Sequence, residues 1–165
     1  MSKIIAIILA LATSVGISAA EVPIRGMVSS KCVINTDTPG VFGNPTPNTL
    51  STSAVDGGVK PVIRYDVVES GYYKATITTP SAFTSSPTLA DVVNWTSVVT
   101  VSKVTDAAMS AYTTNKRMYG NTTEFDLSVA GTVWFSADSK AQYGYGKSFP
   151  AGEYKAVVLA ECIAL

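Results

Sequence analysis

Two cysteines stand near opposite ends of this chain, Cys32 close to the start and Cys162 close to the last residue. If they form a disulfide, their Cα atoms must lie within roughly 7 Å, so the two ends of the domain must meet. The bond would close a loop of about 130 residues, which chain-entropy arguments value at roughly 4–5 kcal/mol. A pair of buried free thiols is the alternative interpretation.

The first twenty residues have the pattern of an export signal. Lys3 supplies a positive charge, residues 4–12 form an almost unbroken apolar run, and small residues lead up to Ala20. We therefore expect residues 1–20 to be a signal peptide and the mature chain to begin at Glu21. The apolar run is short for a membrane span, and a retained anchor is the alternative. In an exported protein, two cysteines most simply form one disulfide.

Composition narrows the function classes. Without Lys3, eleven basic residues face twelve acidic ones, and the charges are scattered singly. Such a chain has no electrostatic footprint for nucleic acid or an anionic membrane. Histidine is absent, which excludes a His-dependent triad or a His-ligated metal site. We therefore expect no enzymatic activity and no cofactor. The length of the mature chain predicts one domain, over residues 32–165.

Apolar residues alternate with polar ones between turn-rich interruptions, which predicts an all-β fold. The tripeptide Glu69-Ser70-Gly71 predicts a hairpin between two of the strands, and Gly131 a bulge or bend inside another. Six strands, one fewer than in a seven-stranded sandwich, are expected at residues 27–35, 62–68, 72–79, 92–104, 125–137 and 153–165.

Two segments do not have the strand pattern. Residues 36–58 are rich in Pro, Gly, Asn and Thr and predict a long connection, with one weak strand near Leu50. Residues 106–118 contain several alanines behind Asp106, a residue type that caps helices. We expect this second segment to form a single helical turn or a loop.

A short alternating apolar stretch precedes Cys32. Pro23 cannot donate a hydrogen bond to a sheet, so the stretch belongs at a sheet edge or in a free segment. If Cys32 is fixed to the last strand, the eleven residues before it extend about 36 Å at most. We interpret residues 21–31 as an extension that reaches another molecule; the alternatives are the first strand of a complete sandwich, or disorder. Its residues on one strand face are Val22, Ile24, Gly26 and Val28.

The C-terminal region adds a second pattern, because Pro150-Ala151-Gly152-Glu153-Tyr154 makes a turn into the last predicted strand. The export signal, the alternating extension with a central glycine and this P-A-G-x-Y turn together resemble the subunits of chaperone–usher fimbriae. Many of those subunits also carry one disulfide near the start of the mature domain. Two features differ from the family's usual pattern: Ala164 replaces a penultimate aromatic residue, and Cys162 lies in the final strand.

The resemblance implies an incomplete immunoglobulin-like sandwich of about six strands plus an N-terminal donor strand. In that family a periplasmic chaperone lends a strand to fill the gap, and the N-terminal extension of the next subunit later replaces it. The donor residues would be Val22, Ile24, Gly26 and Val28. The acceptor groove and terminal strand would contain Gly152, Tyr154, Ala156, Val158 and Ala160.

The expected function is therefore that of a structural subunit of an extracellular fimbria, exported through the periplasm and supporting adhesion. Its expected partners are copies of itself, a periplasmic chaperone and an outer-membrane usher, and a host surface receptor is a further candidate. We expect no binding to nucleic acid or membrane. The alternative function is a monomeric secreted β-sandwich that binds a carbohydrate or a receptor.

The remaining residues that could carry chemistry have simpler interpretations. Trp95 and Trp134 lie in strand-like contexts and are expected in the core or half-buried rather than as ligand platforms. Tyr143 and Tyr145 belong to a Tyr-Gly-Tyr-Gly loop, interpreted as an aromatic-rich turn with receptor contact as the alternative. The scattered carboxylates are expected to be solvated: Asp66, Glu69, Glu124 and Asp126.

Overall fold

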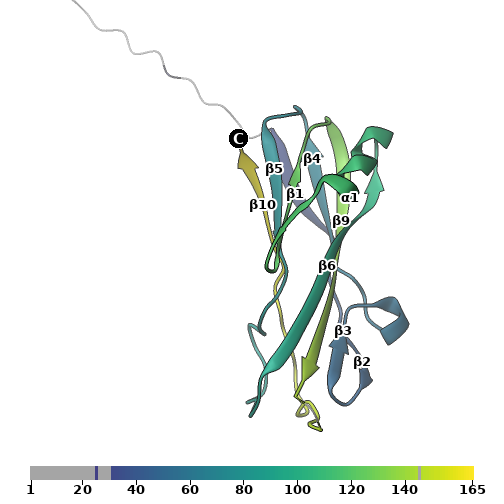
Figure 1. Ribbon diagram of the computed structural model, residues 1–165, viewed down its shortest axis with the longest axis vertical. Helices are drawn as coiled ribbons and strands as arrows, with labels where there is room; N and C mark the ends of the chain where they lie inside the picture. The colour runs from purple at the N-terminus through teal and green to yellow at the C-terminus, as the bar shows by residue number, and fades with distance from the viewer. Residues whose placement is uncertain (1–24, 26–30, 145) are drawn as a thin grey trace, which may run out of the picture.

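The computed structural model describes Arg25, residues 31–144 and residues 146–165. Two antiparallel sheets make up the fold, which confirms the prediction of an all-β sandwich (Figure 1). The first sheet contains β1 (Cys32–Thr38), β2 (Gly43–Thr46), β3 (Thr49–Ser51), β4 (Val62–Val67), β6 (Val93–Val104) and β9 (Gly131–Tyr143). The second contains β5 (Tyr73–Thr78), β7 (Arg117–Tyr119), β8 (Thr122–Asp126) and β10 (Leu159–Ala164).

The long strand β9 organises the first sheet. Along one side it pairs first with β4 and then, near its C-terminal end, with β3, while β6 pairs along the other side. β1 continues the sheet beyond β4, and the second sheet has the order β10-β5-β8-β7. In Figure 1 the C-terminus lies at one end of the molecule, and β2 and β3 lie toward the other.

The core lies between the sheets, where alternate residues of facing strands point inward. Tyr65 and Phe135 are fully buried, and their rings meet edge to face with centroids 5.5 Å apart. Phe125 packs on Phe135 at a centroid distance of 4.3 Å. Each large side chain buried in this way contributes roughly 1.5–3 kcal/mol. The other large apolar side chains that are fully buried are Ile77, Val99, Met109, Leu127 and Val133.

The helical content is small, and its longest stretch lies within residues 106–118, where the sequence predicts a single helical turn or a loop. The 3-10 helix η2 (Ala107–Ala111) is followed by a single turn of α-helix, α1 (Tyr112–Asn115). The Asp106 carboxylate accepts a hydrogen bond from the Ala108 amide and caps the segment, as predicted. The helix η1 (Ala54–Asp56) forms another short turn.

The hairpin predicted at Glu69-Ser70-Gly71 is wrong. β4 pairs with β1 and β9, whereas β5 pairs with β10 and β8, so the two strands belong to different sheets. The turn crosses from one layer to the other, with Gly71 at a φ of +80°. Both strands have alternating apolar residues and are joined by a short loop. This local pattern does not distinguish two strands paired in one sheet from two strands in opposite sheets.

The strand predicted over residues 125–137 is two strands in different sheets. β8 ends at Asp126, and β9 begins at Gly131. Gly131 has a φ of +136°, and a Cβ atom there would lie 2.8 Å from the Met109 side chain, so the backbone change at this point favours glycine. The predicted bend is therefore present, at the start of a strand.

The remaining boundaries also shift. The last strand, predicted over residues 153–165, is paired as a strand only over β10, and a single bridge joins Lys155 to Ser85 earlier in the segment. Residues 36–58 contain the predicted strand at Leu50, as β3, and also β2. Among the described residues there are ten strands rather than six, the extra ones being short. Residues 1–20 and most of the predicted extension 21–31 lie outside the described residues.

Candidate functional site

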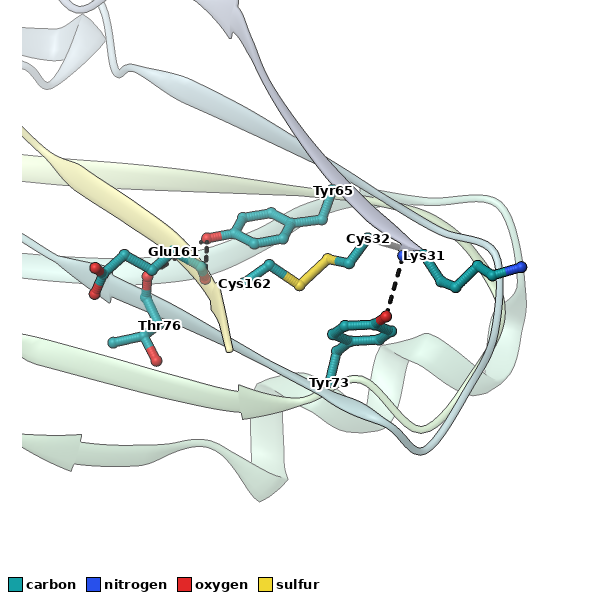
Figure 2. The surroundings of a disulfide bond; sticks show 7 residues. All are labelled: Lys31, Cys32, Tyr65, Tyr73, Thr76, Glu161 and Cys162. Carbon is teal, nitrogen blue, oxygen red and sulfur yellow. Dashed lines mark hydrogen bonds between the residues drawn. A yellow bond between two sulfur atoms is a disulfide. The ribbon is translucent and has the colours of Figure 1, made fainter. Parts of the chain in front are cut away.

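The predicted disulfide between Cys32 and Cys162 is present, with the two Cα atoms 6.4 Å apart. It joins the start of β1 to β10, and so ties one sheet to the other (Figure 2). No free cysteine is found among the described residues, so the alternative of two free thiols is wrong. The first and last described strands are therefore held together at one end of the sandwich.

Two tyrosines reinforce this end. The Tyr65 hydroxyl lies within hydrogen-bond distance of the carbonyl oxygens of Glu161, at 3.2 Å, and Thr76, at 3.4 Å (Figure 2). Burial raises the pKa of Tyr65 far above its usual value, and the nearby Glu161 charge raises it further. The Tyr73 hydroxyl accepts a hydrogen bond from the Lys31 amide at 3.1 Å. This end of the sandwich is closed by covalent and hydrogen-bonded contacts.

Among the described residues, no strand neighbours the edges of β1 and β10 that face away from their sheets. β1 pairs only with β4, and β10 pairs only with β5, in the described part of the chain. Unpaired strand edges offer free N–H and C=O groups to any further extended segment. The two open edges meet at the disulfide and bound a groove farther along.

Two adjoining cavities mark this groove. One has a volume of about 260 Å³ and lies between residues 36–42 on one side and residues 156–158 on the other. The second, of about 450 Å³, lies between residues 40–42 and residues 152–156. Both cavities are lined by Gly40, Phe42 and Ala156, so they adjoin. We call the space between residues 36–42 and residues 152–158 the edge groove.

The segment leading into β10 has one face toward the protein and one toward solvent. The predicted groove residues are half-buried and share the inner face: Tyr154, Ala156, Val158 and Ala160. The residues between them point outward, with Val157 57% and Leu159 52% exposed. The alternation shows that residues 154–160 run as an extended strand, although paired strand structure begins only at Leu159.

Main-chain groups on the groove side of this segment are unpaired. The Lys155 amide donates to the Ser85 carbonyl at 2.8 Å, and the Lys155 carbonyl accepts from the Thr84 amide at 2.8 Å. Because an extended chain alternates the direction of its main-chain groups, those of Ala156 face the opposite side, toward the groove. Within the described residues neither Ala156 nor Val158 has a main-chain hydrogen bond. Such groups need a partner, from water or from another chain.

Gly152 begins the groove segment and cannot readily be another residue. Its φ is +152°, and a Cβ atom there would lie 2.5 Å from the Pro87 ring. The turn into the last strand therefore requires both the glycine conformation and the absence of a side chain.

An aromatic cluster packs beside the groove. The Phe83 ring contacts the rings of Trp95, at 4.8 Å between centroids, and Tyr154, at 5.1 Å. Phe42 and Phe149 lie 6.1 and 5.9 Å from the same ring. None of the residues Phe42, Phe83 and Phe149 was predicted to form part of a site. The one sequence feature that could have indicated their role is that aromatic residues are rare in Pro- and Gly-rich connections.

The other aromatic residues singled out in the sequence are packed against the protein. Trp95 and Trp134 are half-buried, as predicted. The Lys103 ammonium lies 4.6 Å from the centre of the Trp134 ring. Tyr143 is buried at the end of β9 and stacks on Phe149 with centroids 5.2 Å apart, so it does not belong to an exposed loop. Tyr145 lies outside the described residues.

Three of the four singled-out carboxylates form ion pairs. Glu124 meets Lys74 at 2.8 Å, Asp126 meets Arg117 at 2.6 Å and Asp66 meets Arg64 at 3.0 Å. Across the described ranges, no three His, Cys, Asp or Glu side chains gather in a way that could hold a metal ion. Nor does that part of the chain contain a helix with the length and apolar character needed to cross a membrane.

The predicted donor residues Val22, Ile24, Gly26 and Val28 lie outside the described residues, so their role stays a prediction. The groove wall formed by residues 36–42 was missed, because that segment reads as a plain connection. Comparisons of the chain with protein-family models, with curated proteins and with solved structures find no match.

Proposed function

We propose that this chain is a structural subunit of an extracellular fimbria, which polymerises by donor-strand exchange and supports adhesion. The observation that carries the proposal is the edge groove, where apolar side chains and unpaired main-chain groups occur together. An extended segment with alternating apolar residues satisfies both, because it adds main-chain hydrogen bonds and fills successive pockets.

The strand order supports an immunoglobulin-like sandwich that lacks one strand. β1, β4, β9 and β6 are neighbours in one sheet, and β10, β5 and β8 are neighbours in the other. The missing strand would lie beside residues 152–158, the segment that leads into β10, on the side that has no neighbouring strand in the described residues. Filling that position removes an exposed sheet edge, which otherwise promotes aggregation.

The proposed donor is the segment of residues 22–28 of the next copy. Its alternating Val22, Ile24 and Val28 would each contribute roughly 1.5–3 kcal/mol on burial. Before assembly, a strand of a periplasmic chaperone would occupy the groove, and an outer-membrane usher would receive the complex. The disulfide fits this route, since such bonds form and persist outside the reducing cytoplasm.

The first experiment removes the donor. Deletion of residues 21–28 should abolish growth of linear polymer while the chaperone complex still forms, because the groove stays intact. Replacement of Gly26 by leucine should slow assembly, since a bulky side chain would enter a crowded position. Polymer from the deletion variant would contradict the donor role, and an unchanged rate for Gly26→Leu would contradict the position of Gly26.

The second experiment fills the groove. Ala156 lines both cavities, so Ala156→Trp should block docking and give a protein that donates but does not accept a strand. Ala107→Trp is the matched control, because Ala107 is exposed on η2 and does not line the groove. Polymer length should fall for the groove variant alone. A mature wild-type protein that stays a soluble monomer would favour the monomeric binding domain instead.

A further inference from the structure

The disulfide leaves too little room for a strand beside it. Neighbouring strands in a sheet lie 4.7–4.9 Å apart, so a strand inserted between two others needs about 9.5 Å between them. Cys32 and Cys162 have their Cα atoms 6.4 Å apart. No third strand passes between β1 and β10 at that level.

Farther along, the edge groove lies between the segment that continues β1 and the segment that leads into β10. The edge groove ends at residues 36 and 158 on the side nearer the disulfide and extends to Gly152 on the other. At about 3.3 Å for each residue, residues 152–158 span roughly 20 Å, the length of a docked strand of about seven residues. The groove is thus open at one end and blocked at the other.

We infer that the Cys32–Cys162 disulfide is an end stop for the docked strand, limiting it to about seven residues paired along residues 152–158. The inference rests on the proposed function and adds to it the length and the register of the bound segment. The occupant is the alternating segment 22–28 of a second copy, which has the required length.

An end stop would fix the register of the docked strand, which the alternation of apolar residues does not fix by itself. A strand that slides by two residues along its partner presents the same face, so apolar alternation does not by itself fix the register. A covalent bond across the groove stops the slide in one direction. The Tyr65 hydroxyl, in contact with the Glu161 carbonyl, stabilises β10 at the same level.

Amide hydrogen exchange on the full mature chain tests the inference, with assembled polymer compared with unassembled protein. Docking should protect the amides of Ala156 and Val158 and leave that of Ala164, beyond the stop, unchanged. Ala164 reports on the same edge, because the next amide, that of Leu165, points to the other side and donates to Tyr72. Protection of Ala156 together with Ala164 would overturn the end stop and leave the proposed function standing. Protection of neither Ala156 nor Val158 would overturn both.

The variant Cys32→Ala/Cys162→Ala separates a covalent stop from simple fraying of the last strand. With the bond removed, protection should extend to Ala164 in the polymer. Protection that still ends before Ala164 would overturn the role of the disulfide.

A peptide series gives the same answer in the oxidised protein if that variant does not fold. Synthetic peptides of residues 22–28, 20–28 and 22–30 are tested as inhibitors of polymer growth; Ala20 belongs to the expected signal peptide and serves here only to lengthen the probe. Two further paired residues in an open groove should improve inhibition roughly tenfold, at about 1.4 kcal/mol per factor of ten. One of the two longer peptides should show no improvement, because its added residues meet the disulfide. Improvement by both would overturn the inference, and a lack of inhibition by all three would overturn the proposed function as well.

Discussion

The two ends of the sandwich differ in how β1 and the C-terminal segment are held together. At the disulfide end, β1 and β10 are tied together, and the core behind them includes Tyr65 and Phe135 with no exposed surface. At the groove end the same two edges diverge, and Tyr154 and Ala156 are only half-buried. Closure at an edge therefore needs pairing of the main chain, because apolar side chains alone leave main-chain groups without partners.

The half-burial at the groove end does not reflect irregular packing. Its aromatic rings meet in specific edge-to-face contacts around Phe83, and Gly152 is held against Pro87. The half-burial is therefore part of an ordered arrangement that presents an apolar trough. If the two ends differ in stability as their geometry indicates, substitutions at the disulfide end should lower the free energy of unfolding more than comparable substitutions beside the groove.

Removal of the disulfide should have the largest effect on the free energy of unfolding. Cys32→Ala/Cys162→Ala opens a loop of 130 residues, so the free energy of unfolding should fall by roughly 5 kcal/mol. Urea unfolding of the oxidised wild type and the variant measures it, and reduced wild type is the control for side-chain effects. A loss below about 2 kcal/mol would mean that the unfolded chain retains structure near its ends.

The next effect contrasts two phenylalanines. Phe135→Ala, at the closed end, should lower the free energy of unfolding by about 3–5 kcal/mol, because the side chain is fully buried. Phe83→Ala, beside the groove, should cost about half as much, since Phe83 is half-buried. Denaturant unfolding measures the loss in the free energy of unfolding for both variants. Equal losses would contradict the contrast between the two ends.

A smaller effect is expected at the turn into the last strand. Gly152→Ala places a side chain at a φ of +152° and against Pro87, which should cost about 2 kcal/mol. Gly120→Ala is the control, because Gly120 also has a positive φ but open space around it, and it should cost about 1 kcal/mol. Thermal unfolding compares the two. An equal loss would show that contact with Pro87 contributes nothing.

The smallest effect concerns the hydroxyl at the closed end. Tyr65→Phe should lower the free energy of unfolding by about 1 kcal/mol at pH 8, because the hydrogen bonds to Glu161 and Thr76 are lost. Burial raises the pKa of Tyr65 in the folded protein, so only the unfolded form ionises near pH 10. The stabilisation from Tyr65 is thus complete below pH 10 and is lost as the pH rises above it.

The measurement is the free energy of unfolding of wild type and Tyr65→Phe at pH 8 and near pH 11. The advantage of the wild type should shrink at the higher pH, since the variant has no hydroxyl to ionise at this position. An advantage that stays constant would show that the hydroxyl ionises equally in both states. It would then be more accessible to water than its burial indicates.

Much of the fold could be predicted from local pattern. β4, β5 and β6 lie within one residue of their predicted bounds, and the turn behind Asp106 was predicted. Alternation also identified the inner face of the last strand, because its period of two does not depend on what the strand pairs with. The hairpin at Glu69-Ser70-Gly71 failed for the complementary reason, since pairing partners are a non-local property.

The groove shows the same division. Tyr154, Ala156 and Val158 were singled out from the chain end, but the opposite wall at Gly40 and Phe42 was not. That wall comes from a Pro- and Gly-rich connection, whose position depends on the pairing of β2 with β3 and of β3 with β9. Local propensity contains little information about such a segment.

Residue chemistry and a period of two along the chain were enough to predict the all-β class, the disulfide and the faces of the main strands. Only the tertiary structure decided which strands pair, which cross between sheets and where the edges of β1 and β10 stay open. Those outcomes depend on contacts between residues far apart in the chain. Whether an edge is closed or open is set by the whole sandwich around it.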